Sequence, residues 1–175
     1  MKPGANEKAG PITDFLVKDH GRLEALLQSA VAQVGSVDQG LYDQFRAGLL
    51  RHIGMEEKIL LPAAQRLRGG EPLPIASKLR LDHGAIASLL MPPPTATIIA
   101  TIRAVLKVHN TIEEGPGGLY ETCDELASSE AAQLLAKLQA APELAVLPCS
   151  DGPAVMPAVQ RALERAGYQL LDDKV

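Results

Sequence analysis

Residues 52–57 of the chain read His-Ile-Gly-Met-Glu-Glu, and residues 109–114 read His-Asn-Thr-Ile-Glu-Glu. In both stretches the first glutamate follows the histidine by four residues. Side chains four residues apart are neighbours on an α-helix, with Cβ atoms about 5–6 Å apart. If the two stretches are helical, each therefore presents one nitrogen donor and one oxygen donor to the same point.

The sequence around these stretches has the period of amphipathic helices, because apolar residues recur at three- and four-residue steps. The pattern predicts four long helices, over residues 12–34, 37–67, 75–90 and 95–114. Pro62 lies inside the second helix and is expected to kink it, since proline has no N–H and clashes with the preceding turn. Short connections rich in Gly and Pro separate the four. We therefore predict an all-α fold, an antiparallel up-down four-helix bundle.

The chain beyond residue 119 follows the helical pattern less clearly. Short C-terminal helices are expected at residues 119–126, 129–140 and 153–171, with a proline-containing linker before the last. We divide the chain into a bundle of residues 1–126 and a C-terminal helical extension of residues 127–175, packed on or beside the bundle. The extension has no histidine, and its sequence indicates no chemistry.

Composition excludes several classes of function. The 175 residues carry a formal net charge of −4, with 3% aromatic residues and no Trp, so neither a basic surface nor base-stacking side chains favour nucleic-acid binding. No run of about 18 apolar residues could span a membrane. Residues 1–7 lack the apolar segment of a signal peptide, and Cys123 and Cys149 are isolated thiols. We expect a soluble, cytoplasmic protein without nucleic-acid or membrane partners.

The four histidines of the chain fall one on each predicted helix, on its apolar face: His20, His52, His83 and His109. A single histidine on such a face usually finds a hydrogen-bond partner in the core. Four in one core need a common partner, since each buried polar group left unpaired costs about 1–3 kcal/mol. A metal ion is the obvious one, and Glu56 and Glu113 would share it, because an isolated buried glutamate is disfavoured.

An internal repeat arranges these residues in two sets. Asp-His-Gly occurs at residues 19–21 and again at 82–84, and each is followed by one of the two His-x3-Glu-Glu stretches. A pseudo-twofold axis would bring two three-ligand sets face to face: His20, His52 and Glu56, and His83, His109 and Glu113. Two histidines and a carboxylate are typical of non-haem iron(II), and adjacent sets suggest a dinuclear centre. Zinc or another divalent cation, and a metal-free hydrogen-bonded core, are alternatives.

The motifs Asp19-His20, His52-x3-Glu56-Glu57 with Leu61-Pro62, Asp82-His83 and His109-x3-Glu113-Glu114 resemble the hemerythrin-like (HHE cation-binding) family. The resemblance covers about residues 12–126. It implies a four-helix bundle that holds two non-haem iron ions, oxo- or hydroxo-bridged, with both glutamates able to bridge. The metal ligands it implies are His20, His52, Glu56, His83, His109 and Glu113.

The function that this resemblance implies is the binding of dioxygen or a related small ligand, for sensing, storage or iron homeostasis. We expect a binding protein rather than an enzyme. A di-iron oxidase or peroxidase, a bundle that binds zinc or another divalent cation, and a metal-free interaction bundle are the alternatives.

One position departs from the family pattern. Oxygen-carrying hemerythrins have a further histidine one turn before the third-helix histidine, and Leu79 stands there. One iron would then need water, a second carboxylate such as Glu57 or Glu114, or Tyr120. We interpret the two glutamates as solvent-facing charges and Tyr120 as a core residue.

Two further interpretations concern the neighbours of the histidines. Asp19 and Asp82 precede histidines and point about 100° away from them on the helix, so we interpret them as surface charges. Gly21 and Gly84 follow the same histidines and are expected to allow close helix approach, as are Gly48 and Gly54.

Overall fold

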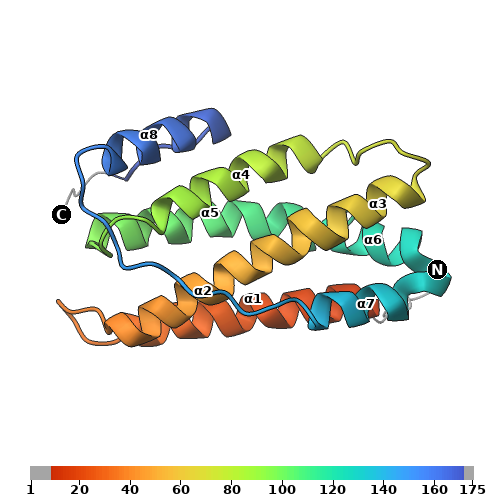
Figure 1. Ribbon diagram of the computed structural model, residues 1–175, viewed down its shortest axis with the longest axis horizontal. Coiled ribbons are helices and arrows are strands. Elements are labelled where there is room, and N and C mark those ends of the chain that lie inside the picture. The colour runs from red at the N-terminus through yellow and green to blue at the C-terminus, as the bar shows by residue number, and fades with distance from the viewer. Residues whose placement is uncertain (1–8, 172–175) are drawn as a thin grey trace, which may run out of the picture.

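The computed structural model describes residues 9–171, and this part of the chain is helical without any strand. The long helices lie along the long axis of the molecule (Figure 1): α1 (Pro11–Ala30), α2 (Gln39–Met55), α4 (Ala76–Leu89) and α5 (Ala96–Glu114). The predicted all-α class is thus confirmed for the described residues. Residues 1–7, for which we expect no export signal, lie outside them.

The start of α1 is held by a carboxylate from a distant helix. Asp124 accepts hydrogen bonds from the backbone N–H groups of Ile12, at 3.0 Å, and Thr13, at 2.9 Å. A Cβ atom at Gly10 would overlap that carboxylate, so a larger residue at this position would displace Asp124. The helix ends at Ala30, before the predicted end at residue 34.

The second predicted helix is continuous but contains an irregular turn. α2 passes into a π-helical turn, η1 (Glu56–Leu60), and then into α3 (Leu61–Leu67). In this turn the N–H of Leu61 donates to the carbonyl of Glu56, five residues earlier. The turn directly precedes Pro62, where a regular helix loses a hydrogen bond. Such π-turns inside helices are frequent at functional sites.

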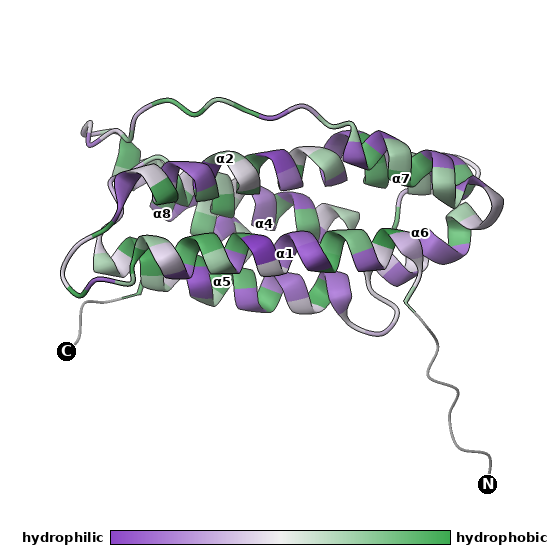
Figure 2. Ribbon diagram, turned by 90° about the horizontal axis from the view of Figure 1, so that it is seen from below, coloured by the Kyte–Doolittle hydropathy of each residue, from purple (hydrophilic) through white to green (hydrophobic). Residues whose placement is uncertain are grey.

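Buried apolar side chains form two clusters rather than one. The first contains residues of α1, α2, α4, α5 and α8 (Val155–Ala166), such as Leu27, Phe45 and Ile102. The second contains residues of α1, the end of α2, η1, α3, α4, α6 (Leu119–Ala127) and α7 (Ala131–Gln139), such as Leu16, Leu79 and Leu119. Figure 2 shows polar and apolar positions alternating along the helices of the bundle. The buried histidines and glutamates belong to neither cluster.

The C-terminal part consists of α6 (Leu119–Ala127), η2 (Ser128–Glu130), α7 (Ala131–Gln139) and α8. A linker from α7 to α8 crosses α2 (Figure 1), where Arg46 donates to the carbonyl of Leu147 and Arg51 to that of Ala141, both at 2.9 Å. α8 packs on α4 and stops at Ala166, because Gly167 adopts φ 86°, so the helix predicted to residue 171 is too long. The division at residue 126 stays a prediction.

Three smaller expectations have clear outcomes. Gly21, Gly54 and Gly84 face open space, so the close helix approach expected there is wrong, whereas a Cβ at Gly48 would lie 2.8 Å from Leu23. Both cysteines are free. Between residues 9 and 171, no helix combines the length and the apolarity that crossing a bilayer requires.

Candidate metal centre

Six buried or nearly buried donors from four helical segments meet between the two apolar clusters. α1 supplies His20, α2 and η1 supply His52 and Glu56, α4 supplies His83, and α5 supplies His109 and Glu113. They form two overlapping groups, each able to hold a cation. Centre A is His20, His52, Glu56 and Glu113, and centre B is Glu56, His83, His109 and Glu113.

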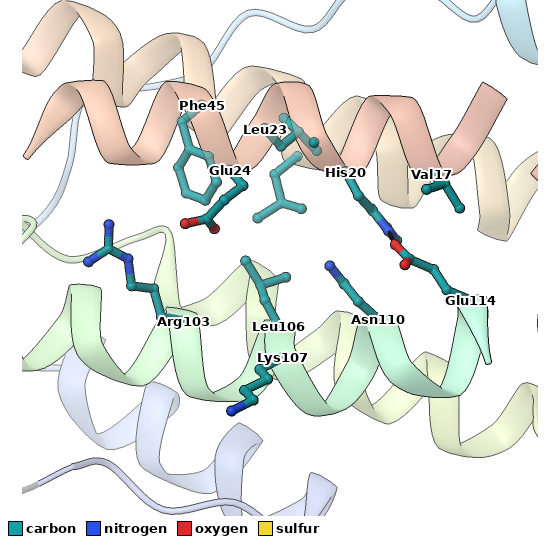
Figure 3. Close-up of a pocket in the computed structure, with 12 residues that line it drawn as sticks. Val17, His20, Leu23, Glu24, Phe45, Arg103, Leu106, Lys107, Asn110 and Glu114 are labelled. Atoms are coloured by element: carbon teal, nitrogen blue, oxygen red, sulfur yellow. Dashed lines mark hydrogen bonds and ion pairs between the residues drawn. The ribbon is translucent and has the colours of Figure 1, made fainter. Parts of the chain in front are cut away.

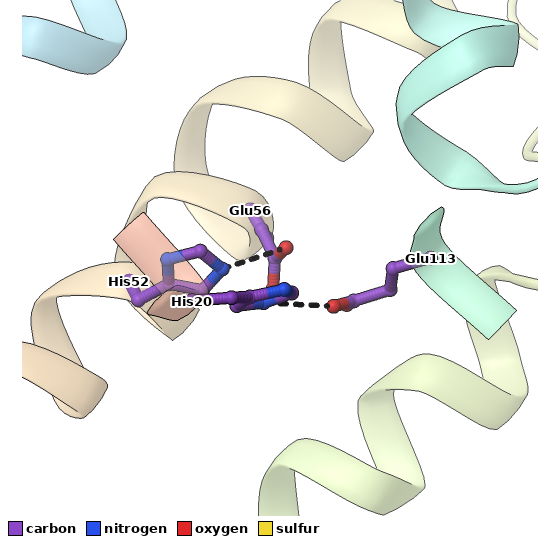
Figure 4. A group of neighbouring side chains, drawn as sticks. All are labelled: His20, His52, Glu56 and Glu113. Carbon is purple, nitrogen blue, oxygen red and sulfur yellow. Dashed lines mark ion pairs between the residues drawn. The ribbon is translucent and has the colours of Figure 1, made fainter. Parts of the chain in front are cut away.

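The two glutamates belong to both centres because each turns one oxygen to each side. In centre A, His52 Nε2 lies 3.3 Å from Glu56 Oε1, and His20 Nε2 lies 3.4 Å from Glu113 Oε2 (Figure 4). In centre B, His83 Nε2 lies 3.1 Å from Glu56 Oε2, and His109 Nε2 lies 2.9 Å from Glu113 Oε1. A carboxylate in this position can bridge two cations.

The outer nitrogen of every histidine is bound by a carboxylate of a neighbouring helix. Asp19 lies 2.8 Å from His52 Nδ1, Asp82 lies 3.2 Å from His109 Nδ1 and Glu57 lies 2.6 Å from His83 Nδ1, while Glu114 holds Nδ1 of His20. A hydrogen bond donated by Nδ1 fixes the orientation of the ring and leaves the lone pair of Nε2 available to a cation. All four Nε2 atoms therefore face the shared carboxylates.

This outer ring corrects two expectations from the sequence. Asp19 is 8% exposed and Asp82 is fully buried, so neither is a surface charge. Each points away from its own histidine, as expected, but toward the histidine of the next helix in the same half of the chain. Glu57 and Glu114 are partly exposed, yet each binds a histidine of the other half instead of only facing solvent.

Basic side chains in turn support the two aspartates. Arg22 Nε lies 2.8 Å from Asp19, and Lys78 Nζ lies 2.6 Å from Asp82. Lys78 also donates to the carbonyl of Ala166 at the end of α8, at 2.7 Å. The C-terminal extension thus contacts the support of centre B.

Tyr120 enters the site from α6. The turn before α6 is very tight, because a Cβ at Gly118 would lie 2.6–2.7 Å from three backbone carbonyl oxygens. This turn brings Tyr120 back to the end of α5, where its hydroxyl lies 2.7 Å from Glu56 Oε1 and 3.0 Å from Glu113 Oε2. The same hydroxyl lies 3.1 Å from Nε2 of His20 and 3.1 Å from Nε2 of His52. Its four partners are the donor atoms of centre A.

The electrostatics of the site favour positive charge at its middle. Burial lowers the pKa of His52, but the charge of Glu56 and the hydrogen bond with Asp19 outweigh it and raise this pKa to about 10. Burial is likewise outweighed at His83, where the nearby carboxylates of Glu113 and Glu56 raise the pKa to about 10, and at His109, where Asp82 and Glu113 raise it to about 9. Without metal, protons on the imidazoles therefore balance the two carboxylates.

Burial opposes ionisation of the two shared carboxylates, but the histidines around them hold both pKa values below the usual range. Among residues 9–171, three buried atoms of centre B have no hydrogen-bond partner: Glu56 Oε2, His83 Nε2 and Glu113 Oε1. An unpaired buried polar group costs about 1–3 kcal/mol, and a cation would engage all three at once. The donor set and these unpaired atoms fit a bound cation.

The comparison with known families agrees with this geometry. The family model described as the hemerythrin HHE cation binding domain matches residues 11–115. The chain belongs to the hemerythrin HHE cation-binding family. No curated protein and no solved structure matches it. All six donors lie within the hemerythrin region, whereas Tyr120 lies beyond its end.

A surface pocket leads toward the hemerythrin site between α1 and α5. It has a volume of about 370 Å³, and His20 and Glu114 are in its wall (Figure 3). Exposed Arg103 and Lys107 also line it, and the side-chain amide oxygen Oδ1 of Asn110 is buried without a hydrogen-bond partner among the described residues. The pocket thus borders His20, the most exposed of the four histidines.

The structure brings together all six residues that the sequence predicted as metal ligands, and it places His20 with His52 and His83 with His109, as predicted. That they bind metal stays a prediction. Sequence reasoning assigned each glutamate to one half and left bridging open, whereas each glutamate faces both centres.

Sequence reasoning missed the roles of Asp19 and Asp82. Tyr120 is a core residue, as interpreted from the sequence, but its hydroxyl also contacts the donor atoms of centre A. The repeated Asp-His pair could have indicated the role of the aspartates. A repeat that keeps a buried histidine in each half can also keep a carboxylate that binds a buried histidine.

Proposed function

We propose that this chain holds two iron ions in centres A and B and presents them to dioxygen or a related small ligand, for sensing, storage or iron homeostasis. The proposal includes an up-down order of the four long helices and a cytoplasmic location. The observation that carries it is the pair of buried donor groups that share Glu56 and Glu113.

The donor chemistry supports iron. Each centre offers two imidazole nitrogens and two carboxylate oxygens, a mixture that suits iron(II) and leaves positions open on a six-coordinate ion. Family membership supports a cation, and the shared carboxylates support two adjacent ones. Bound iron would supply a coordination position for a small ligand and a reversible change of oxidation state.

The protein's own residues have three tasks in this proposal. The outer carboxylates hold the proton of each histidine at Nδ1, so that Nε2 stays free for the cation. The two apolar clusters keep water from both ends of the site. The pocket beside His20 admits a small molecule from solvent.

Elemental analysis of the full chain, purified without an affinity tag, tests the metal. We expect two iron ions per chain after anaerobic loading with Fe(II), and fewer than one in the double variant His52→Ala/His109→Ala. The matched control Glu125→Ala changes an exposed glutamate and should keep both ions. A chain that stays empty, or that takes only zinc under the same conditions, contradicts the proposal.

The small-ligand part needs a second measurement. The visible absorption of the anaerobic iron-loaded protein should change on exposure to air, and removal of oxygen then distinguishes reversible binding from permanent oxidation. If the spectrum of the iron-loaded protein does not change with oxygen or with nitric oxide, the metal site is supported and the proposed role in binding a small ligand is contradicted.

A further inference from the structure

The hydroxyl of Tyr120 is surrounded by metal-binding atoms. It lies 2.7–3.1 Å from four donor atoms of centre A, contributed by His20, His52, Glu56 and Glu113. The side chain is fully buried, and these four atoms are the polar partners of its hydroxyl. A phenol placed only to fill the core would not need to direct its oxygen at all four.

The four distances have the values expected between neighbouring ligand atoms on one metal ion. Bonds from first-row metals to nitrogen and oxygen are about 2.0–2.2 Å long, so ligand atoms at right angles are separated by about 3 Å. Two edges of the donor group, His52–Glu56 and His20–Glu113, measure 3.3 and 3.4 Å. An oxygen about 3 Å from all four corners of such a group occupies the position of a fifth ligand above it.

Centre B has no equivalent. Its four donor atoms have no hydroxyl partner among residues 9–171, and three of them have no hydrogen bond at all. Leu79, which stands where oxygen-carrying hemerythrins have a histidine, precedes His83 by one turn and so belongs to the side of centre B. Tyr120 therefore does not replace the absent histidine at the same ion; it completes the other one.

We propose that Tyr120 is a ligand of the cation in centre A, bound through its phenolate oxygen. The inference rests on the proposed function, because it needs an ion in that centre. On binding, the O–H bond of the phenol breaks, its proton leaves to solvent and an oxygen–metal bond forms, with no electron transferred. Centre B has no such tyrosine, so the coordination position that Tyr120 would fill in centre A has no counterpart side chain there among the described residues.

The experiment is resonance Raman and visible absorption of the full chain loaded with iron and oxidised in air to the ferric state. A phenolate bound to ferric iron gives a charge-transfer band, and excitation in that band enhances tyrosine ring modes. We expect these modes in the wild type and in Tyr42→Phe, and their loss in Tyr120→Phe. Tyr42 is the matched control, because it is buried and its hydroxyl has no partner among the described residues.

A second measurement does not depend on the folding of a variant. Wild-type protein made with ring-deuterated tyrosine should show the same band with its ring modes shifted. A wild type that binds two iron ions and shows no tyrosine modes overturns the inference and leaves the proposed function standing; Tyr120 is then only a hydrogen-bond donor. A wild type that binds no iron overturns both.

Discussion

Centres A and B are built alike by the two halves of the chain and differ in one residue. Each has two histidines, shares the same two glutamates and holds both histidine rings with outer carboxylates. Only centre A receives the hydroxyl of Tyr120. The duplicated helices thus produce a symmetric frame, and Tyr120 of α6 makes the two candidate ion positions chemically different.

The largest effect is expected from a shared carboxylate. Glu113→Ala removes one oxygen donor from each centre at once and leaves four imidazoles opposite a single glutamate, so we expect the iron content to fall from two ions per chain to near zero. Elemental analysis after loading and dialysis measures it, with Glu125→Ala as the control. Retention of one full ion would mean that Glu113 serves a single centre and that the site is not shared.

Single histidine variants separate the two centres. His52→Ala should lose the ion of centre A together with the tyrosine modes, whereas His109→Ala should lose the ion of centre B and keep those modes. Each variant is expected to bind about one iron ion. If both variants lose the tyrosine modes, the two centres do not bind their ions independently, and the assignment of Tyr120 to centre A alone is contradicted.

The outer carboxylates should have smaller and matched effects. Loss of a carboxylate behind a metal-binding histidine typically weakens metal affinity by about 10–100-fold. We expect Asp19→Asn to weaken centre A by this factor and Asp82→Asn to weaken centre B, as measured by titration with a competing chelator. Asp14→Asn, at an exposed ion pair with Lys18, is the control and should change neither. An effect of Asp82→Asn on the tyrosine modes would contradict the assignment.

The smallest effect concerns protons in the metal-free protein. The pKa values of His52, His83 and His109 rise from 6.5 to about 9–10 on folding, so their contribution to stability is complete below pH 6.5 and is lost as the pH rises to about 10. Chelator-treated protein should therefore lose several degrees of melting temperature over this range. Protein loaded with metal should not, because the cation replaces the protons. A flat profile without metal would exclude charged histidines in the site.

The sequence predicted the long helices and the six residues that meet between them because both depend on local spacing. A histidine and a glutamate four residues apart share a helix face whatever the rest of the chain does, and His52–Glu56 and His109–Glu113 are placed by that rule alone. Tyr120 could not be placed in this way. Its position depends on how sharply the chain turns at Gly118. That turn is set by tertiary contacts and not by the helical periodicity of the sequence.

The outer carboxylates show the same limit. The helical wheel correctly directs Asp19 and Asp82 away from their own histidines, but only the packing of α1 on α2 and of α4 on α5 shows that they point into a neighbouring ring. The π-turn was not predicted either, although Pro62 marked its place.

The side chain of Lys78 connects the C-terminal helix to the candidate metal centre. Its ammonium joins the last turn of α8 to Asp82, and Asp82 orients His109. A chain shortened before Ala166 would release this ammonium into water and remove one anchor from the imidazole behind it. The two ion positions would then respond unequally to trimming, since the parallel support of His52, from Arg22 through Asp19, is contained within the first helix.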